Sequence, residues 1–169
     1  MELIFDTLKL WIIFFFILLF LLIFLENRRK NRLKRKIYSG NFLYYKDFEN
    51  HWIISDGRGT SETPTGFKYE DGPGCYVITI YNRPVKHKKW DNYENIYIGQ
   101  SVHVCQRVHN HFNGKGNGDI YADIKYGKYV YVRFVKCKKE EMNELEKNLI
   151  ATFDATSSYN KTKGGATKW

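Results

Sequence analysis

The sequence predicts a small α+β domain with the element order β-β-α-β-α, preceded by one N-terminal transmembrane helix. Two observations lead to this prediction. Residues 10–25 are wholly apolar, and beyond residue 74 short segments of alternating apolar side chains are separated by segments whose apolar residues recur at helical spacing. With 169 residues, the chain has room for one domain and an appendage.

The apolar run has the length and composition of a membrane span. All of its residues except Trp11 are Leu, Ile or Phe. At about 1.5 Å per residue they form roughly 24 Å of helix, which Leu8 extends toward the ~30 Å hydrocarbon core. On an insertion scale the run contributes roughly −4.5 to −9 kcal/mol, against at most about 3 kcal/mol for Lys9 at its edge. We therefore expect a transmembrane helix at residues 8–27.

The charges on either side of the run predict its orientation. Seven Arg and Lys residues lie within residues 28–36, whereas Glu2, Asp6 and Lys9 precede the run. The positive-inside rule then places the N-terminus outside the cell membrane and the rest of this single-pass protein in the cytoplasm. A signal peptide would show the reverse order of charge and a small-residue cleavage site. A buried core helix is the other alternative, and the charge order favours an uncleaved anchor.

Most of the positive charge lies beside this anchor. The formal net charge is +9, to which residues 1–27 contribute −2, residues 28–36 contribute +7 and residues 37–169 contribute +4. We expect residues 28–36 to attract anionic lipids of the bilayer. The charge on the remainder is compatible with a polyanionic ligand but does not require one.

The cysteines predict neither a disulfide framework nor a metal centre. Cys75, Cys105 and Cys137 are isolated from one another in the sequence, with no Cys-x-x-Cys spacing. Reduced thiols in a cytosolic domain are the simplest interpretation. A zinc site is the alternative, and the spacing does not support it.

The elements follow from periodicity and from turn residues. We expect the basic segment to continue the helix to about residue 40, and residues 28–72 to form a juxtamembrane segment and linker with one short strand at residues 52–54. The domain itself is expected at residues 73–165. Its predicted elements are strands at residues 75–81, 95–99 and 129–136, a helix capped by Ser101 that ends at Phe112 and turns Val104 and Val108 inward, a glycine-rich loop at residues 113–118, and a helix at residues 140–153 with the apolar stripe Met142, Leu145, Leu149 and Phe153.

Five polar residues of this domain form an ordered series that suits phosphodiester hydrolysis: Tyr76, Tyr97, Arg107, His111 and Glu146. Hydrolysis needs an activated water, a cation near the phosphate oxygens and help for the leaving oxygen. A lone carboxylate can hold hydrated Mg²⁺, and a guanidinium can neutralise charge that develops on the phosphate. The tyrosines can hold or deprotonate the water, and the histidine can accept or relay its proton.

Each of these residues by itself is more often structural than functional. The chain has 13 tyrosines, most of which are expected to fill the core, and a helical Arg, His or Glu usually lies on a solvated face. Arg107 and His111 are four residues apart, so they share one face of their helix. Glu146 falls beside the apolar stripe, where a carboxylate is unusual. The hypothesis therefore depends on the joint order of the series.

That joint order resembles the GIY-YIG nuclease family. The tripeptide Gly74-Cys75-Tyr76 stands in for the first motif, with Cys75 in place of Ile or Val, and residues 97–99, Tyr-Ile-Gly, match the second. The family's helical arginine and histidine correspond to Arg107 and His111. Its metal-binding glutamate corresponds to Glu146, within a Leu-Glu-Lys-Asn-Leu-Ile segment similar to the N-terminal nuclease domain of the bacterial excision-repair enzyme. The family's terminal asparagine corresponds to Asn160, before a Gly-Gly pair as in phage homing endonucleases.

The resemblance implies a three-stranded antiparallel sheet flanked by helices, and DNA cleavage that uses one Mg²⁺ or Mn²⁺ with Glu146 as its ligand. It implies that Tyr76 or a neighbour is the base, that Arg107 binds the phosphate, and that Gly74, Gly99 and Asn160 organise the site. Residues 82–96, between the two motifs, form a long insert, and the proline common before the terminal asparagine is missing.

The function expected from these residues is a membrane-anchored, metal-dependent endonuclease that cuts DNA on the cytoplasmic side, with incoming foreign DNA as a logical target. One alternative is a catalytically inactive nucleic-acid-binding module. The other is a lipid-binding membrane adaptor built around residues 28–36. The sequence identifies no protein partner.

Overall fold

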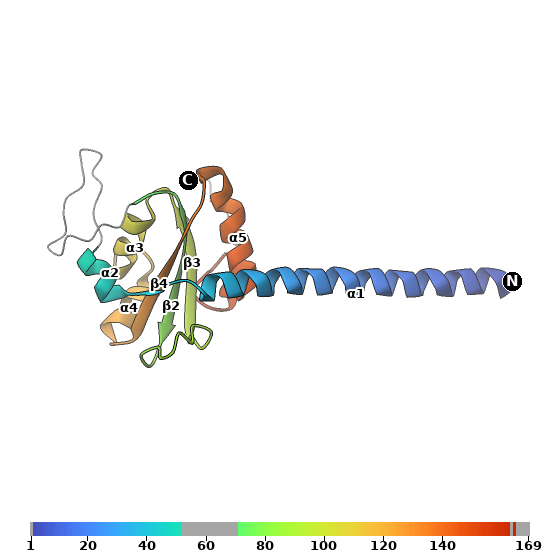
Figure 1. Ribbon diagram of the computed structural model, residues 1–169, viewed down its shortest axis with the longest axis horizontal. Helices are drawn as coiled ribbons and strands as arrows, with labels where there is room; N and C mark the ends of the chain where they lie inside the picture. The colour runs from blue at the N-terminus through green and yellow to red at the C-terminus, as the bar shows by residue number, and fades with distance from the viewer. Residues whose placement is uncertain (1, 52–70, 163, 165–169) are drawn as a thin grey trace. The chain divides into compact units, whose positions relative to one another are not determined.

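The computed structural model describes residues 2–51, 71–162 and 164, and the chain divides into two compact units, Met1–Lys36 and Ile37–Trp169. Helix α1, Glu2–Tyr38, is continuous, so the basic segment extends the apolar helix as predicted (Figure 1). The side chains of residues 10–25 are all exposed. By length and composition α1 is a candidate membrane span from Lys9 onward, near the N-terminus.

The second unit is an α+β domain, as predicted, built around a four-stranded antiparallel sheet. The strands are β1 Leu43–Tyr44, β2 Gly74–Tyr81, β3 Asn95–Ser101 and β4 Tyr129–Lys136, in the order β1-β4-β2-β3. The prediction of three strands was therefore short by one. The additional strand, β1, pairs Leu43 with Val132 and Tyr44 with Tyr131 inside the segment that was expected to be a linker.

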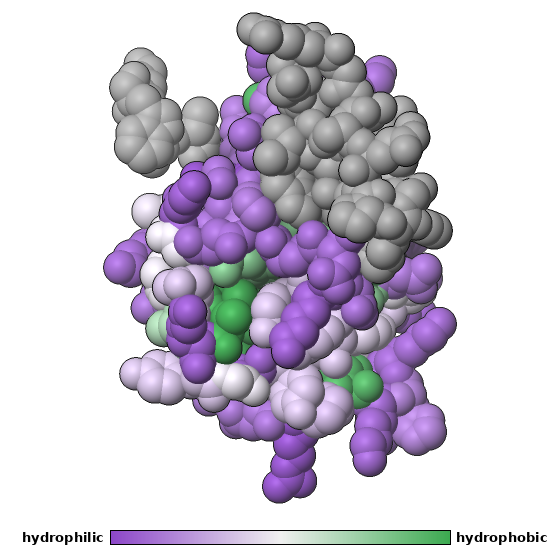
Figure 2. All heavy atoms as spheres, turned by 90° about the vertical axis from the view of Figure 1, so that its left-hand side faces the viewer, coloured by the Kyte–Doolittle hydropathy of each residue, from purple (hydrophilic) through white to green (hydrophobic). Residues whose placement is uncertain are grey.

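Helices cover both faces of this sheet (Figure 1). Helices α2 Tyr45–His51, α3 Val104–Phe112 and α4 Gly118–Lys125 lie on one face, and α5 Met142–Phe153 lies on the other. Seen from the side of α2 and α4, the surface is mostly hydrophilic, with small hydrophobic areas between the polar side chains (Figure 2). Because β2 lies between β3 and β4 with helices above and below, all of its residues are buried.

Several local predictions were wrong for identifiable reasons. The segment expected to be a linker contains β1 and α2, and the segment after the glycine-rich loop contains α4. Ser101 ends β3 instead of capping α3: its hydroxyl accepts the N–H of His103 at 3.0 Å, and α3 begins at Val104. Leu145 is only half-buried, because α5 turns Ile150 and Glu146 toward the sheet. The strand expected at residues 52–54 falls outside the described residues.

The packing on the α3 side of the sheet positions the polar series. Tyr76, Ile78 and Ile80 of β2 pack with Val108 of α3 and Ile120 of α4 in one buried cluster. Burying several such side chains contributes roughly 1.5–3 kcal/mol each, as an upper estimate. This cluster therefore fixes α3 against β2, and with it the residues that α3 carries toward Tyr76.

Candidate active site

Tyr76 and His111 form a buried hydrogen-bonded pair between β2 and α3. Tyr76 is 1% exposed and His111 is fully buried, and 2.9 Å separates the tyrosine hydroxyl oxygen from Nε2 of the histidine. The backbone N–H of Asn117 donates to Nδ1 of the histidine at 2.7 Å. Since a neutral imidazole has one N–H and one acceptor nitrogen, the hydrogen lies on Nε2, which donates to the Tyr76 hydroxyl.

His111 stays neutral in this environment. Burial, and then the nearby Arg107 guanidinium, lower the pKa of its imidazole from 6.5 to about 3. Both ring nitrogens are occupied, one as an acceptor from Asn117 and the other as the donor to Tyr76. The histidine is therefore placed to hold the tyrosine hydroxyl in a fixed orientation.

Tyr97 and Arg107 complete this cluster from β3 and from the preceding turn of α3. The Tyr97 ring centroid lies 6.2 Å from that of Tyr76 and 5.0 Å from that of His111. The exposed Arg107 guanidinium lies close enough to both tyrosine hydroxyls to lower the pKa of each. One cation thus acts on two phenols and is open to solvent.

Two opposing effects set the acidity of these phenols. Burial, followed by the neighbouring Tyr97, raises the pKa of Tyr76, and Arg107 lowers it. For Tyr97 as well, burial raises the pKa and Arg107 opposes the rise. Burial prevails at both residues, so in the protein alone both are neutral phenols at pH 7. A further positive charge nearby would favour the phenolate.

Glycines allow this close packing. Gly99 pairs with Tyr76 across the β2–β3 ladder, and a Cβ atom at Gly99 would overlap the tyrosine hydroxyl. A Cβ atom at Gly116 would overlap Nδ1 of His111. Gly74 acts further away: a Cβ there would lie 2.7 Å from the backbone oxygen of Val135, so this glycine permits the approach of β2 and β4.

Glu146 approaches from α5, on the opposite face of the sheet from α3. It is 9% exposed, and its charge raises the pKa of both Tyr76 and Tyr97, so it lies within electrostatic range of them. One carboxylate oxygen accepts a hydrogen bond from Nε2 of Gln100 at 3.1 Å. Strand β3 connects the tyrosine cluster with Glu146, because Tyr97 and Gln100 point to opposite faces of this strand.

Gln100 and Asn143 also belong to this arrangement, although the sequence did not predict them as site residues. The Gln100 amide nitrogen also donates to Oδ1 of Asn143 at 2.6 Å, which orients the amide. Its other end, Oε1, is buried and has no hydrogen-bond partner within the described part of the chain. The available signals were weak: Gln100 directly follows Gly99, and Asn143 precedes Glu146 by one helical turn.

The residues around Glu146 fit a hard divalent cation. The buried carboxylate and the unpaired Gln100 oxygen are both acceptors, and Mg²⁺ prefers oxygen atoms and retains bound water. Among the described residues no three His, Cys, Asp or Glu side chains gather, so Glu146 would be the acidic ligand. Gly164, at φ +80°, leaves room beside it, since a Cβ there would lie 3.1 Å from the carboxylate.

Asn160 organises the edge of the sheet. Its side chain accepts the N–H of Ile98 at 2.8 Å and donates to the carbonyl oxygen of the same residue at 2.7 Å. The neighbouring Tyr159 N–H donates to the carbonyl of Ile96 at 3.2 Å. The C-terminal segment therefore satisfies the free edge of β3, the strand that carries Tyr97.

The candidate residues Tyr76, Tyr97, Arg107, His111, Glu146 and Asn160 all fall within one match to a known family. Residues 73–160, more than half of the chain, match the family model described as the GIY-YIG catalytic domain. The chain belongs to the GIY-YIG family. A GIY-YIG domain implies a nuclease, that is, a phosphodiester hydrolase. Searches of curated proteins and of solved structures found no match.

The departure of this GIY-YIG chain from the first motif has a structural explanation. Cys75 is fully buried on the α5 side of β2, where its Sγ atom contacts the carbonyl oxygen of Met142 at 3.5 Å. Burial raises the pKa of its thiol, so the residue is a protonated, small hydrophobic side chain. It occupies the place of an aliphatic residue without adding a reactive group to the site.

Proposed function

We propose that this protein is a membrane-anchored, divalent-metal-dependent endonuclease that hydrolyses phosphodiester bonds in DNA on the cytoplasmic side of the cell membrane. The observation that carries the proposal is one cluster: Tyr76 hydrogen-bonds His111, the Tyr97 ring packs beside both, and the charges of Arg107 and Glu146 act on the two phenols. Membership of the GIY-YIG family supports nuclease activity. DNA as substrate and Mg²⁺ or Mn²⁺ as cofactor are proposals that follow from it.

In the proposed reaction, the exposed Arg107 guanidinium binds a phosphate oxygen and offsets the charge that develops there. Water attacks phosphorus, and Tyr76 Oη, in its phenolate form, takes the proton of the water. The bond to the leaving oxygen breaks, and that oxygen takes a proton from solvent. Nε2–H of His111 donates to Tyr76 Oη, and the nearby Arg107 guanidinium lowers the pKa of the phenol, so both favour the phenolate. Tyr97 orients the water from the adjacent strand.

Glu146 would hold the cation, with Gln100 orienting the carboxylate. When bound, a divalent cation supplies positive charge that stabilises the phosphate oxygens and lowers the pKa of neighbouring groups. His111 is a positioning residue in this scheme, because its two nitrogens are already used. Gly74, Gly99 and Asn160 organise the backbone around the site.

The anchor supplies the location. We propose a transmembrane helix at residues 8–27 and a basic juxtamembrane segment at residues 28–36, which leads through β1 and α2 to the nuclease motifs at residues 73–165. The length and composition of α1 and the charge that follows its apolar part support this topology, with the N-terminus outside and anionic lipids near residues 28–36. Tethering would raise the local concentration of the nuclease where foreign DNA enters the cell.

The test is a cleavage assay on the full-length chain in neutral lipid nanodiscs, with plasmid DNA and Mg²⁺ or Mn²⁺. We expect nicking that a chelator abolishes, and a loss of at least about 10²-fold in Glu146→Gln. The matched control is Glu144→Gln, an exposed glutamate of the same helix, which should cut normally. Full activity of Glu146→Gln would refute the role of the carboxylate, and DNA binding without any cleavage would point to an inactive binding module.

A further inference from the structure

The connection between β2 and β3, residues 82–94, is a basic loop with its charges exposed. Residues 82–90 contain Arg83, Lys86, Lys88 and Lys89 and no acidic residue. All four side chains are exposed, and within the described residues none of them forms a salt bridge. Glu94, at the end of the basic loop, is instead paired with Lys128 at 3.1 Å. Exposed Asp91 is the other acidic residue of the loop, so residues 82–94 keep a net positive charge.

The backbone at the tip of the basic loop is held in an uncommon conformation. His87 and Lys88 have φ angles of 55° and 56°, in the left-handed region that residues other than glycine rarely adopt. Such conformations persist where the surroundings hold them and are frequent at binding surfaces. Here they turn the chain within residues 86–89, where the N–H of Lys89 donates to the carbonyl oxygen of Lys86 at 3.3 Å.

Aromatic residues fix the base of the loop to the end of α1 and to the segment that follows it. Trp90 is buried and stacks on Phe42, with ring centroids 4.6 Å apart, and its carbonyl oxygen accepts the Tyr81 hydroxyl at 2.8 Å. The Tyr93 hydroxyl contacts the carbonyl oxygen of Phe153 at 3.5 Å, and the same phenylalanine packs against Tyr38. In the chain, Tyr38 and Phe42 come directly after the basic residues 28–36.

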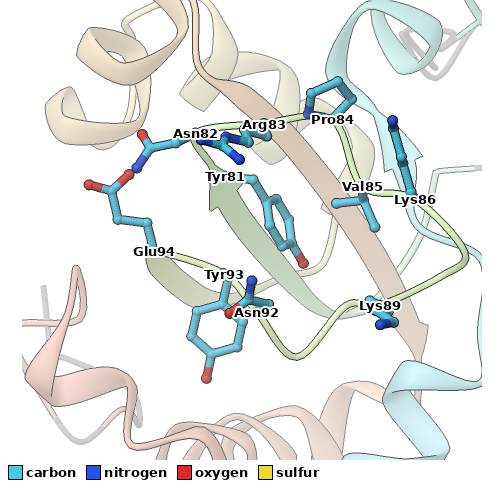
Figure 3. A pocket seen from close by; sticks show the side chains of 10 residues that line it. All are labelled: Tyr81, Asn82, Arg83, Pro84, Val85, Lys86, Lys89, Asn92, Tyr93 and Glu94. Carbon is cyan, nitrogen blue, oxygen red and sulfur yellow. The ribbon is translucent and has the colours of Figure 1, made fainter.

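The basic loop lies away from the candidate active site. Tyr76 is near the start of β2, whereas the loop follows the end of that strand at Tyr81, about 17 Å further along. Figure 1 shows the loop at the arrowhead end of β2. In Figure 3, Lys86 extends from the loop away from Tyr81, beside a surface hollow of about 760 Å³ to which Arg83 and Lys89 also contribute.

We propose that the basic loop is a second contact with the membrane, which binds the anionic lipid surface next to the anchor. This inference rests on the proposed anchoring by α1. The charge of the loop complements an anionic leaflet, and its aromatic base ties it to the first residues of the domain that leave the membrane. A lipid surface fits better than DNA, because the loop is at the opposite end of the sheet from Tyr76. The contact would keep that catalytic end turned toward the cytoplasm.

Weak individual contacts are sufficient for this role. A lysine close to an anionic leaflet strengthens association by roughly fivefold, and the attraction decays within about 8 Å at physiological salt. Because the anchor already confines the domain to the membrane surface, lipid binding by the loop is an intramolecular event. Its effective concentration is set by residues 28–36, which connect the anchor to the domain. The contact should therefore depend on lipid charge and on salt.

The experiment measures backbone hydrogen exchange of residues 82–94 in the full-length chain, reconstituted into nanodiscs of phosphatidylcholine alone or with phosphatidylserine. We expect exchange to slow at least about fivefold in the anionic nanodiscs and to recover at high salt. The triple variant Lys86→Glu, Lys88→Glu and Lys89→Glu should lose this dependence on lipid composition. Equal exchange in the two lipid compositions for the unaltered chain would overturn the proposal.

A matched control separates a local contact from general charge. The triple variant Lys115→Glu, Lys125→Glu and Lys139→Glu changes the net charge equally at exposed sites elsewhere in the domain, and should keep the lipid-dependent protection of the loop. Loss of protection in both variants would overturn a specific role for the loop. Protection of the loop by duplex DNA in neutral nanodiscs, with none from anionic lipid, would assign the surface to nucleic acid instead and also overturn the proposal.

The lipid-dependent exchange of the loop can be measured independently of nuclease activity. Hydrogen exchange requires no catalysis, so loop protection can be seen even if the chain never cuts DNA. Plasmid cleavage in the same neutral nanodiscs reports the nuclease independently of lipid charge. A chain that does not co-purify with nanodiscs would refute the anchor, and with it the lipid contact of the basic loop.

Discussion

Nε2 of His111 lies 2.9 Å from the hydroxyl oxygen of Tyr76, and the backbone N–H of Asn117 decides which of the two is the donor. Because that N–H occupies Nδ1, the histidine donates and the tyrosine accepts. A histidine in this state cannot take a proton from the phenol without losing one of its two hydrogen bonds. His111 therefore orients the Tyr76 phenol and does not serve as the group that accepts a proton.

Replacing His111 should show whether it orients the Tyr76 hydroxyl or acts as the base. The amide nitrogen of Gln can approximate Nε2, so His111→Gln should retain cleavage within about tenfold and keep the pH profile of the wild type. His111→Leu removes the donor, and we expect a loss of about 10²-fold as the phenol loses its orientation. Plasmid nicking between pH 6 and 9 measures both. A histidine that served as the base would instead make the two variants equally inactive.

The depressed pKa of His111 predicts how stability depends on pH. Above pH 6.5 the histidine is neutral in both the native and the unfolded chain. Between pH 6.5 and about 3 the unfolded chain binds a proton that the native protein excludes, so the free energy of unfolding falls as pH falls, by at most about 5 kcal/mol over the whole window.

His111→Gln should remove this contribution. Denaturation midpoints of the full-length chain at pH 7 and pH 5 measure the change, and the stability lost on acidification should be smaller in the variant by up to about 2 kcal/mol. Parallel losses in the two proteins would show that the histidine titrates normally in the fold.

Gly99 should tolerate no side chain. A Cβ atom there overlaps the Tyr76 hydroxyl, so Gly99→Ala must displace the phenol, and we expect cleavage to fall by about 10²-fold. Gly118→Ala is the control, because nothing lies within 4 Å of its Cβ position and it starts helix α4. That variant should be fully active and as stable as the wild type, or more stable by up to about 1 kcal/mol. Unchanged cleavage by Gly99→Ala would contradict the role of this contact.

Asn160 should contribute mainly to stability. Asn160→Ala leaves both the N–H and the carbonyl oxygen of Ile98 without a protein partner, at about 1–3 kcal/mol for each group that stays buried. We expect a lower melting temperature and faster hydrogen exchange at residues 96–98. A variant that melts normally yet cannot cut DNA would instead indicate that Asn160 touches the substrate.

Gln100 should tune the affinity of Glu146 for metal. Gln100→Leu removes the hydrogen bond to the carboxylate and the unpaired amide oxygen beside it. Loss of a group that orients a ligand typically lowers metal affinity by about 10–100-fold, which electron paramagnetic resonance of Mn²⁺ can measure without catalysis. Gln106→Leu, an exposed glutamine on α3, is the control. Equal Mn²⁺ affinity in the two variants would exclude Gln100 from the site.

The elements that could be predicted from the sequence are those with repeated periodicity. Strand β4 and helix α5 repeat their patterns over eight and twelve residues, and both were found at the expected place. Strand β1 has two residues, too few to show an alternation, and it exists because β4 offers it an edge. Helix α4 was not predicted, although Asn117 is a residue type common at the N-cap. Its side chain accepts the N–H groups of Asp119 and Ile120.

Part of the candidate site was likewise predictable from the sequence, and part was not. The order of Tyr76, Tyr97, Arg107 and His111 was sufficient to predict a cluster, because two of these residues share a helical face and the other two lie on adjacent strands. The direction of the hydrogen bond between Tyr76 and His111 was not predictable, since it depends on the backbone of the following loop. Nor was the contact between Gln100 and Asn143, which brings together segments 43 residues apart.

The two-residue strand β1 also affects how the domain would respond to tension applied through α1. A pull transmitted through α1 would first load the ring contacts of Tyr38 and Phe42, and would then peel Leu43 and Tyr44 from β4. In the order β1-β4-β2-β3, strand β4 stands between that weak edge and the two strands that carry Tyr76 and Tyr97. The short strand would separate before the others, and the strands that carry Tyr76 and Tyr97 would stay paired.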